Sequence, residues 1–455
     1  MSFEFQLPAG WEWSNIDTLK AEGRSIVSGP FGSNIGSRFF VEAGVPVIRG
    51  NNLSLDAIRF KDTGFVFLSD EKAEEFRNCE AHVNDLVFTA AGTIGQVGII
   101  PPNARFPKYI ISNKQLRARL DTRRIRPIFA YYWLSSPAMI QFIQSRNTGS
   151  TIPLINLTVL KSLPIPVPPL LIQDAIVQTI EPLDNRISLL RETNTTLEAI
   201  AQTLFKSWFV DFDPVKAKAQ GKQPEGMDEA TAALFPSEFE ESALGLIPKG
   251  WRVERLGSVI PVKDGTHESP KPTESGYPLI TSRHITGGKM DFDNTYLISD
   301  VDFINISKRS RVDRFDVLIT MIGTVGIPVI VLEDKTDFAI KNIGLFKTSS
   351  KLEFSHYLYL LLLSSNMKHY IEARLAGTTQ KYVSLKALRE IEIILPSGDI
   401  LSMFSQVTFS LFDKIHENDG LIKTITTLRD TLLPRLISGQ LRINQPQDVI
   451  NEVGA

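Results

Sequence analysis

Two stretches of the chain place apolar residues at alternating steps of three and four. The first stretch runs through Ile176, Ile180, Leu183, Ile187, Leu190, Asn194, Leu197, Ala201, Leu204 and Trp208, and the second through Phe404, Thr408, Leu411, Ile415, Asn418, Ile422, Ile425, Leu432 and Leu436. In the second stretch Leu428 and Arg429 share the one irregular step. A seam this narrow, kept over several heptads, indicates a long helix that packs against a partner helix.

The two seams fit each other if the helices are antiparallel. Pairing Asn194 with Asn418 places apolar seam positions opposite one another in both directions: Ile187 with Ile425, Leu190 with Ile422, Leu197 with Ile415, Ala201 with Leu411 and Trp208 with Phe404. Two buried amides can satisfy each other and fix the register of a helix pair. We therefore predict an antiparallel coiled coil with a buried Asn194–Asn418 pair; the alternative is that each seam packs on its own domain.

Two prolines and the length of the seams complete this pattern. Pro182 lies near the start of the first stretch and Pro434 near the end of the second, so an antiparallel pair brings both to the same end. About 36 residues at ~1.5 Å per residue give a rod on the order of 55 Å. The helices are therefore expected to act as a spacer between domains.

Outside the helices, the chain repeats itself. Pro8-Ala-Gly-Trp11 returns as Pro248-Lys-Gly-Trp251, and the run from Asp85 to Gly95 returns from Asp316 to Gly326. Further matched positions follow in the same order: Gly44 with Gly276, Asn113 with Asn342, Ser135 with Ser364, Gly149 with Gly377 and Pro168 with Pro396. Each copy mixes β-branched runs, Gly and Pro turns and a few helical segments, which predicts an α+β domain.

The fold class predicted is α+β, with two pseudo-symmetric domains separated by two long helices that form an antiparallel coiled coil. The boundaries expected are 1–165 for the first domain, 166–210 for the central helical spacer, 211–245 for an acidic linker, 246–393 for the second domain, 394–445 for the C-terminal helical spacer and 446–455 for a tail. Trp11 and Trp251 are expected to anchor the two cores, because tryptophan is usually buried.

Composition excludes some kinds of protein and leaves others open. No apolar run approaches the ~20 residues of a membrane span, the N-terminus lacks the pattern of a secretory signal, and an intracellular, cytoplasmic protein is expected. The single cysteine, Cys79, excludes an internal disulfide, and the six histidines lack metal-ligand spacing, so no metal site is expected.

Charge is segregated along the chain although the net charge is only −2. Eight basic residues and one acidic residue lie between Arg105 and Arg126, and a second basic cluster consists of Lys308, Arg309, Arg311 and Arg314. A DNA-facing surface needs such clusters, but a basic run can also be an ordinary solvated face. Charge alone therefore does not identify a DNA-binding surface.

Catalytic motifs are absent or weak. The Pro-Pro pairs at Pro101 and Pro168 lack the Asp or Asn and the aromatic residue that flank an amino-methyltransferase loop, and Gly288-Lys289 is followed by Met290 rather than the Ser or Thr of an ATP-binding loop. Asp316 with Glu333 and Lys335 has the order of a metal-dependent nuclease, but matches this short are common by chance. A non-catalytic chain is therefore expected.

The sequence as a whole resembles the specificity subunits of type I restriction-modification enzymes. The residues that carry the resemblance are the two Pro-x-Gly-Trp starts, Ser28-Gly-Pro-Phe-Gly-Ser33, Val47-Ile-Arg-Gly-Asn51, the two Gly-Thr-x-Gly turns, the segments Leu204–Pro214 and Gln223–Met227, and the closing segment Leu432–Leu441. The second copy has Thr281-Ser-Arg-His-Ile where the first has the Arg-Gly-Asn run, which suggests that the two domains have different targets.

The resemblance implies a non-catalytic subunit of a defence system against foreign DNA. Each target recognition domain would read one half of a split, asymmetric site on double-stranded DNA, and the helices would set the gap and dock two modification subunits. Adenine methylation from S-adenosylmethionine, and ATP- and Mg-dependent restriction, would belong to the modification and restriction subunits, and this chain would bind no cofactor.

Base edges are read by Arg, Lys, Asn, Gln and small hydroxyls, and phosphates are held by backbone amides and lysines, so candidates should lie on polar or Gly-rich loops. In the first domain the candidates are Ser28, Ser33, Arg49, Asn51, Asn52, Thr93, Lys108, Asn113, Lys114, Gln115, Arg146, Thr148 and Ser150. In the second domain they are Thr266, His267, Ser282, Arg283, His284, Thr324, Lys341, Asn342, Thr378, Thr379, Gln380 and Lys381. Any one of them could instead be an ordinary turn residue.

Two alternative functions predict different behaviour. A protein-binding scaffold, with helices that dock partners and domains that bind peptides, predicts no salt-dependent affinity for DNA. A metal-dependent nuclease predicts that the chain cleaves DNA without partners.

Overall fold

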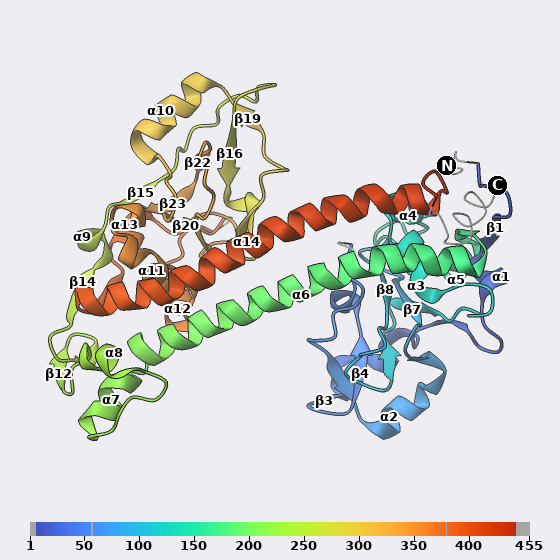
Figure 1. Ribbon diagram of the computed structural model, residues 1–455, viewed down its shortest axis with the longest axis horizontal. Coiled ribbons are helices and arrows are strands. Elements are labelled where there is room, and N and C mark those ends of the chain that lie inside the picture. The colour runs from blue at the N-terminus through green and yellow to red at the C-terminus, as the bar shows by residue number, and fades with distance from the viewer. Residues whose placement is uncertain (1–5, 56–57, 379, 443–455) are drawn as a thin grey trace, which may run out of the picture. The chain divides into compact units, whose positions relative to one another are not determined.

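The computed structural model describes residues 6–55, 58–378 and 380–442 and contains two compact units. Unit 1 consists of residues 1–190 and 421–455, and unit 2 of residues 191–420. Two 40-residue helices, α6 (Leu170–Phe209) and α14 (Gly398–Ile437), contribute to both units (Figure 1). Each unit is a mixture of sheets and helices, so the predicted α+β class with two long helices is confirmed.

Unit 1 is built around two sheets. A four-stranded sheet has the order β2-β10-β7-β8, a five-stranded sheet has the order β3-β5-β4-β9-β6, and β1 pairs with β11. The strands are β1 (Glu12–Asn15), β2 (Ile26–Ser28), β3 (Phe40–Val41), β4 (Val45–Ile48), β5 (Val66–Leu68), β6 (Glu80–Ala81), β7 (Leu86–Thr89), β8 (Val97–Ile99), β9 (Tyr109–Ile111), β10 (Gln115–Ala118) and β11 (Pro164–Val167). The helices besides α6 and α14 are α1 (Ile16–Leu19), α2 (Asp70–Glu75), α3 (Pro127–Leu134), α4 (Pro137–Ser145) and α5 (Leu157–Ser162).

Unit 2 repeats this plan in the same order. Its four-stranded sheet has the order β15-β23-β20-β21, β19-β16-β22 form a second sheet, and β12-β13, β14-β24 and β17-β18 form pairs. The strands are β12 (Phe239–Ser242), β13 (Gly245–Pro248), β14 (Arg252–Arg255), β15 (Val262–Asp264), β16 (Tyr277–Thr281), β17 (Ile285–Thr286), β18 (Lys289–Met290), β19 (Leu297–Ile298), β20 (Val317–Thr320), β21 (Pro328–Ile330), β22 (Ala339–Lys341), β23 (Ile343–Phe346) and β24 (Glu392–Leu395). Its helices are α7 (Asp213–Ala219), α8 (Glu229–Ala233), α9 (Leu256–Val259), α10 (Asp300–Ser310), α11 (Ser355–Leu363), α12 (Ser365–Glu372) and α13 (Leu385–Arg389).

The repeat in sequence is a repeat in backbone pairing. β4 runs parallel to β9 and β16 runs parallel to β22, whereas the four-stranded sheets are antiparallel. The helices α4 and α12 also start alike, because Ser136 caps α4 and Ser364 caps α12 through side-chain oxygens that accept a backbone N–H. The structural counterpart of Ser364 is therefore Ser136 and not Ser135, which the sequence match had paired with it. Matching sequence patterns therefore give matching strands and helix ends.

Glycines fix two of the matched close approaches. A Cβ on Gly29 would collide with the carbonyl oxygen of Ser112, and a Cβ on Gly265 would collide with that of Ile340. Each glycine lies beside the turn that leads into the central strand of its sheet, and its N–H donates across to that segment, to Gln115 O and to Ile343 O. Only glycine lets the two backbones approach this closely.

The hydrophobic core of each unit includes part of the helix pair. In unit 1, Ile176 and Ile180 of α6 and Leu436 of α14 lie in the same cluster as the buried face of α3. In unit 2, Ala201, Trp208 and Phe404 share a cluster with α11, and the rings of Trp208 and Phe404 lie 5.7 Å apart. The apolar seams therefore pack against each other and against the sheets and helices of their own unit.

The structure differs from the expected boundaries at three places. Residues 166–167 belong to β11, which pairs with β1, and residues 394–395 belong to β24, which pairs with β14, so the helices begin later than expected. The expected acidic linker, 211–245, contains α7, α8 and β12, and β12 pairs with β13 across the expected boundary. The expected tail, 446–455, lies outside the described residues.

Trp11 and Trp251 do not have the same burial. Trp251 is 4% exposed and lies in the core of unit 2, whereas Trp11 is half-buried and packs against the edge of the core of unit 1. The prediction of a core anchor therefore holds fully for Trp251 and partly for Trp11. In the described residues, no helix is both long and apolar enough to cross a membrane.

Candidate nucleic-acid interface

A cleft of about 460 Å³ in unit 2 gathers many of the residues that were selected from the sequence. It is lined by Thr281, Ser282, Arg283, Tyr296, Ile322, Gly323, Thr324, Lys341, Asn342 and Gln380. Ser282, Arg283, Thr324, Lys341, Asn342 and Gln380 are all predicted base or phosphate contacts. Four separate loops supply them, so the fold brings together polar groups that are up to about a hundred residues apart in the chain.

Hydrogen bonds between loops hold this cleft in shape. The hydroxyl of Ser282 donates to the carbonyl oxygen of Asn342 at 3.3 Å, and the N–H of Gly323 donates to the carbonyl oxygen of Lys381 at 3.3 Å. Asn342 has φ +55°, a left-handed backbone conformation that asparagine tolerates better than most residues. The loops are therefore fixed to one another before any ligand binds.

Neighbours of the cleft hold two more of the candidates. His267 lies between two oxygens, with Nδ1 2.8 Å from Asn342 Oδ1 and Nε2 3.0 Å from Asp264 Oδ2. Thr266 is half-buried, and its hydroxyl accepts from the N–H of Glu268 at 3.1 Å. Thr378 and Lys381 are exposed on the loop that carries Gln380, and Thr379 lies outside the described residues.

Unit 1 has the same set of loops. The turn at Asn113 and Lys114 follows β9, as the turn at Asn342 follows β22, and the N–H of Ala90 donates to the carbonyl oxygen of Lys114 at 2.7 Å. The turn that contains Thr93 contacts the segment after Arg146, because the N–H of Gly92 donates to Pro153 O at 2.9 Å. The candidates exposed on these loops are Ser28, Asn51, Thr93, Asn113, Lys114, Arg146, Thr148 and Ser150.

Two candidates cap turns and do not face solvent, which corrects their assignment. Asn52 is fully buried, accepts from the N–H of Arg49 at 2.9 Å and donates to the carbonyl oxygens of Lys61 and Thr63. His284 is 3% exposed at the matching place in unit 2, where its Nδ1 accepts from the N–H of Thr281 at 3.1 Å. Burial, and then the neighbouring Arg283 guanidinium, lower the pKa of His284, which favours the neutral ring that this cap needs.

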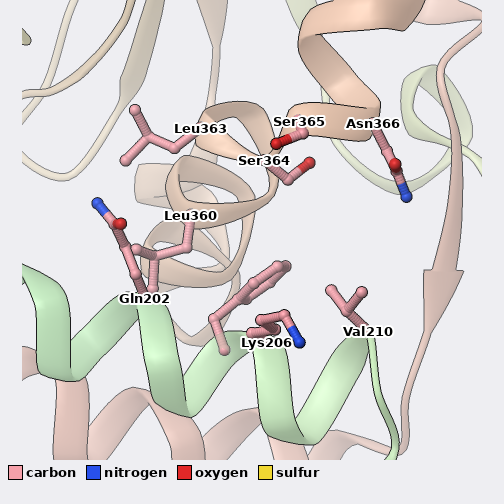
Figure 2. A pocket seen from close by; sticks show the side chains of 9 residues that line it. Gln202, Lys206, Val210, Leu360, Leu363, Ser364, Ser365 and Asn366 are labelled. Atoms are coloured by element: carbon pink, nitrogen blue, oxygen red, sulfur yellow. The ribbon is translucent and has the colours of Figure 1, made fainter. Parts of the chain in front are cut away.

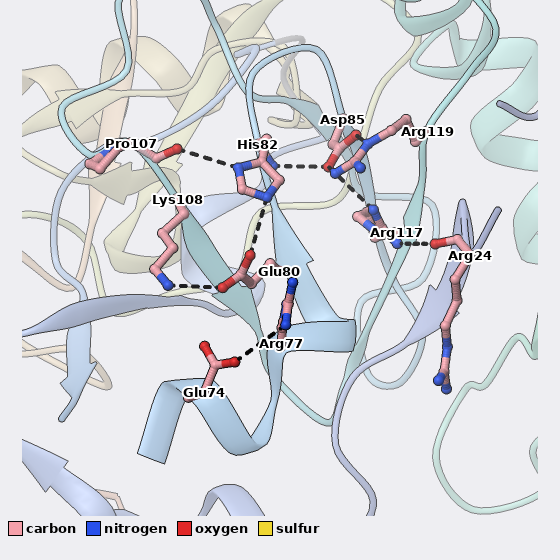
Figure 3. A network of polar contacts seen from close by, with 10 residues as sticks. All are labelled: Arg24, Glu74, Arg77, Glu80, His82, Asp85, Pro107, Lys108, Arg117 and Arg119. Atoms are coloured by element: carbon pink, nitrogen blue, oxygen red, sulfur yellow. Dashed lines mark hydrogen bonds and ion pairs between the residues drawn. The ribbon is translucent and has the colours of Figure 1, made fainter. Parts of the chain in front are cut away.

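Three more candidates of unit 1 are partly or wholly engaged within the protein. Gln115 is 1% exposed and accepts from the hydroxyl of Ser112, and Arg49 is half-buried at the start of the turn that Asn52 caps. Lys108 forms an ion pair with Glu80 at 2.9 Å (Figure 3). The hydrogen bond to Glu80 is the main reason that the pKa of Lys108 is raised. The side chain of Ser33 lies outside the described part.

The basic run from Arg105 to Arg126 is mostly paired with acidic side chains, so it does not form a free basic surface. Arg119 donates two hydrogen bonds to the buried Asp85, each 2.7 Å long, and Arg117 lies 3.5 Å from the same carboxylate (Figure 3). Arg123 pairs with Asp121 and Arg126 with Asp174. These basic side chains pair with acidic side chains in the folded chain. A run of basic residues in the sequence therefore does not become a basic patch on the surface.

The second basic cluster is also occupied. Arg309 pairs with Asp264, Arg311 with Asp313 and Arg314 with Asp334. Asp316, the possible nuclease aspartate, is fully buried and accepts from Lys347 at 2.7 Å and from the N–H of Ser349 at 3.1 Å. It matches Asp85 of unit 1 in position and in holding a basic side chain. Its oxygens therefore serve the fold.

An apolar cavity of about 350 Å³ in unit 2 contains none of the candidates (Figure 2). Gln202, Phe205 and Lys206 reach it from α6, and Leu360 and Leu363 reach it from α11. Lys206 forms an ion pair with Asp211. This lining favours apolar contact rather than the reading of base edges, so the polar cleft remains the better candidate for nucleic acid.

Sequence reasoning missed several residues at these surfaces. Tyr296 and Ile322 line the cleft of unit 2, and Gln96 of unit 1 accepts from Thr89 and donates to Leu53 O beside the Gly50 turn. Phe31 is 92% exposed between residues that were selected. An apolar aromatic residue placed between Pro30 and Gly32, where turns are normally polar, is a signal that could have identified it.

Comparison with known proteins agrees with this arrangement. The family model described as type I restriction modification DNA specificity domain matches residues 42–199 and 248–426, which together are more than half of the chain. A type I restriction enzyme HindI specificity subunit from Haemophilus influenzae is 26% identical over 452 residues, which cover 87% of this chain and 98% of that protein. The MjaIX specificity subunit from Methanocaldococcus jannaschii is 26% identical over 367 residues, which cover 79% and 78% of the two chains.

The fold has a solved counterpart. The crystal structure of a type I restriction-modification S subunit from M. genitalium matches with a TM-score of 0.55 at 16% identity, over 96% of this chain and 98% of that one. At this identity the match speaks for the fold, and the family model speaks for the class of protein. Each matched segment covers most of one copy of the repeat and part of the long helix that follows it. The chain belongs to the DNA specificity subunits of type I restriction-modification systems.

Proposed function

We propose that this chain reads an asymmetric two-part DNA site, one half with each unit, and thereby directs methylation and restriction by partner subunits. The observation that carries the proposal is the polar cleft of unit 2, where Arg283, Lys341 and Gln380 converge on rigid loops. Side chains of these types read base edges and hold phosphates. The corresponding loops of unit 1 carry different residues, which supports two different half-sites.

The helix pair would set the gap between the half-sites. A hydrogen-bonded Asn194–Asn418 pair, 2.8 Å from Nδ2 of Asn418 to Oδ1 of Asn194, lies in the seam within unit 2, with Asn194 6% and Asn418 1% exposed. In unit 1, Asp184 of α6 pairs with Arg429 of α14 at 2.9 Å. Both pairs correspond to nearly the same antiparallel register, so slippage of one helix along the other would bury unpaired polar groups.

The chemistry would be supplied by the partners. Two modification subunits would hold S-adenosylmethionine and methylate adenine, and restriction subunits would use ATP and Mg for translocation and cleavage, in the cytoplasm where cellular DNA lies. This chain would bind none of these cofactors and would contribute the choice of sequence. The helices outside the polar loops are the surface on which modification subunits would dock.

Methylation mapping tests the proposal in cells that carry the intact system. With the wild-type gene we expect a split adenine-methylated motif, and without the gene we expect that motif to disappear. Replacing Arg283 and Gln380 with Ala should relax or change only one half of the motif, and replacing Lys114 and Arg146 with Gln should affect only the other half. Lys386→Gln, on α13 of unit 2 and outside the cleft, is the matched control and should leave the motif unchanged.

The alternatives make opposite predictions. If the chain is a protein-binding scaffold, no motif depends on the gene, and the affinity of the purified complex for DNA does not fall with salt. If the chain is a metal-dependent nuclease, the purified chain cleaves DNA with magnesium alone, and Glu333→Ala abolishes the cleavage. Either result would contradict the proposal.

A further inference from the structure

Phe31 of unit 1 is an apolar aromatic side chain held out in solvent. Its exposed fraction, 92%, is the largest among the large apolar residues that the structure describes; Leu171 follows at 70%. Burial of an aromatic ring is favourable, so a ring left this exposed is either an unused surface residue or one whose partner is another molecule. The loop around it distinguishes these two cases.

The loop that carries Phe31 is fixed on both sides of the residue. The N–H of Gly29 donates to Gln115 O at 3.0 Å, and Nδ2 of Asn113 donates to Gly32 O at 3.1 Å. Gly29 lies so close to Ser112 O that no side chain fits there, and Gly32 has φ +62°. Pro30 restricts the backbone further. The backbone that carries the ring is therefore held in place on both sides.

The same contacts place Phe31 among the predicted DNA-reading residues. Asn113, which holds the loop, and the exposed Lys114 belong to the turn that corresponds to Lys341 and Asn342 of the unit 2 cleft. Ser28 is exposed at the start of the loop. A hydrocarbon ring here cannot donate to or accept from a base edge, so at a DNA surface it would contact the flat faces of bases or the methyl group of thymine.

We propose that Phe31 inserts between neighbouring bases of the first half-site and partly unstacks them, while the polar loops around it read base edges. This proposal rests on the proposed function, because the partner that it assigns to the exposed ring is the stack of bases in the DNA that unit 1 reads. Apolar side chains that enter DNA in this way open base steps and bend the duplex. Flexible pyrimidine–purine steps open most easily, so the first half-site should contain one where Phe31 enters.

Unit 2 has no apolar aromatic residue at the corresponding place. Gly265 corresponds to Gly29 in its close approach to the neighbouring strand, and two residues further on His267 stands where unit 1 has Phe31. His267 is tied to Asp264 and Asn342 and offers a polar ring instead of an apolar one. The inference therefore predicts distortion in one half-site and little distortion in the other.

The experiment uses the complex of this chain with its modification subunits and duplexes that carry the mapped motif. 2-Aminopurine replaces, one at a time, each adenine other than the methylated one, because its fluorescence rises when a base loses its stacking neighbour. The wild-type complex should raise the fluorescence several-fold at one position in the half-site read by unit 1 and at none in the other half-site. Phe31→Ala should abolish that rise, and Phe31→Trp should keep it.

Affinity and its salt dependence separate stacking from general damage to the fold. Phe31→Ala should weaken binding of the specific duplex about tenfold with an unchanged slope against salt, because no phosphate contact is lost. Val301→Ala, another exposed apolar position, on α10 of unit 2 and away from the long helices, is the control and should match the wild type in fluorescence and in affinity. Identical fluorescence and affinity for wild type and Phe31→Ala would overturn the proposal.

Three further outcomes would also overturn it, for different reasons. If Phe31→Ala loses modification subunits on size exclusion while DNA binding by the chain itself is unchanged, the ring contacts a protein partner and not DNA. If mapping finds no split motif at all, the proposed function fails and the assignment of Phe31 fails with it. A motif that exists but shows no change in 2-aminopurine fluorescence leaves the function standing and removes only the insertion.

Discussion

In unit 1, Asp85 lies directly before β7 and holds Arg119; in unit 2, Asp316 lies directly before β20 and holds Lys347. Gly44 and Gly276 both have a positive φ, and a Cβ on either would collide with a carbonyl oxygen of the facing strand. These matched positions are set by backbone geometry, which both units must satisfy to form their sheets.

Other matched positions differ in chemistry. Asn52 and His284 cap the same turn with different side chains, and Phe31 and His267 extend from corresponding loops. A cap requires only an acceptor at the right place, and an exposed loop tip has no requirement from the fold. The two copies therefore share the residues that fix the backbone and differ in the side chains that face a ligand.

The portions of the helix pair that belong to the two units are also held by different interactions. In unit 1, the buried Asp184 meets Arg429, and Arg59 lies 3.6 Å from it and donates to the hydroxyl of Tyr132. In unit 2, aromatic rings dominate, and His356 lies flat against Phe412 with ring centres 4.6 Å apart. The first arrangement depends on paired charge and the second on a neutral ring, so different perturbations should separate the units.

The largest effect is expected from breaking the buried ion pair of unit 1. Asp184→Leu leaves two arginines, Arg429 and Arg59, with only exposed acidic partners, and should lower the free energy of unfolding by about 3 kcal/mol or more, measured by urea titration. Asp184→Leu combined with Arg429→Leu should recover part of this loss. Lys20→Leu, which removes an exposed pair with Asp17, should cost less than about 1 kcal/mol. Equal losses for the exposed and the buried pair would contradict this account.

Acid should weaken unit 2 through His356. Burial alone lowers the pKa of His356 from 6.5 to about 3, and both ring nitrogens lack a hydrogen-bond partner. The unfolded chain binds a proton below pH 6.5 and the folded chain does not, so stability is full above pH 6.5 and falls as the pH drops toward 3. The slope expected is about 1.4 kcal/mol per pH unit.

Variants isolate this contribution. His356→Phe should flatten the loss of stability between pH 6.5 and 4, whereas His369→Gln, at an exposed position on α12, should leave the loss unchanged. Stability can be followed by urea titration at each pH. A pH profile that is the same for His356→Phe and wild type would show that other groups cause the acid sensitivity.

Glycine replacement tests whether the two units share one backbone requirement. Gly29→Ala and Gly265→Ala should each destabilise the protein by about 2 kcal/mol, because a methyl group meets backbone atoms that cannot move far. Gly420→Ala, where nothing lies within 4 Å on an exposed face of α14, should stabilise by about 0.5–1 kcal/mol. A large loss at one position and none at the other would break the equivalence of the units.

The smallest effect expected is the coupling between Asn194 and Asn418. Each single change to Leu leaves one buried amide without its partner, so the double change should cost less than the sum of the singles by about 1 kcal/mol. Asn194 also donates to Asp419 at 3.1 Å, which in turn pairs with Lys289, so Asn194→Leu should cost more than Asn418→Leu. Strictly additive losses would show that the pair does not set the register.

Much of the fold could be predicted from the sequence because the signals are local and periodic. The heptad positions identify α6 and α14 and their antiparallel register, since a seam that repeats every 3.5 residues has one narrow face to bury. The repeated Asp-strand-Gly motif identifies two copies of one domain. Residues 166–167 and 394–395, which end β11 and β24, were assigned to the helical spacers instead, because the pairing partners of these strands, β1 and β14, lie more than 130 residues earlier in the chain.

The candidate site shows the same division between local and long-range information. Loop chemistry together with the internal repeat identified Ser282, Arg283, Thr324, Lys341, Asn342 and Gln380, and the fold brings these together in one cleft. It also selected Asn52, Gln115 and His284, which turn inward, since an Asn, Gln or His that caps a turn has the same local sequence signature as one that reads a base. Which of the two a residue does depends on whether another segment covers it.

The sequence by itself determined the number of domains, the helix pair and its register, because hydrophobic periodicity and duplication are properties of the chain. Only the tertiary structure decided which charges are free. Arg117, Arg119, Arg123 and Arg126 form a basic run in sequence, yet each meets an acidic side chain from another part of the chain, and these partners are Asp85, Glu22 and Asp174. Ion pairing and burial depend on distances between segments far apart in sequence, and those distances exist only once the chain has folded.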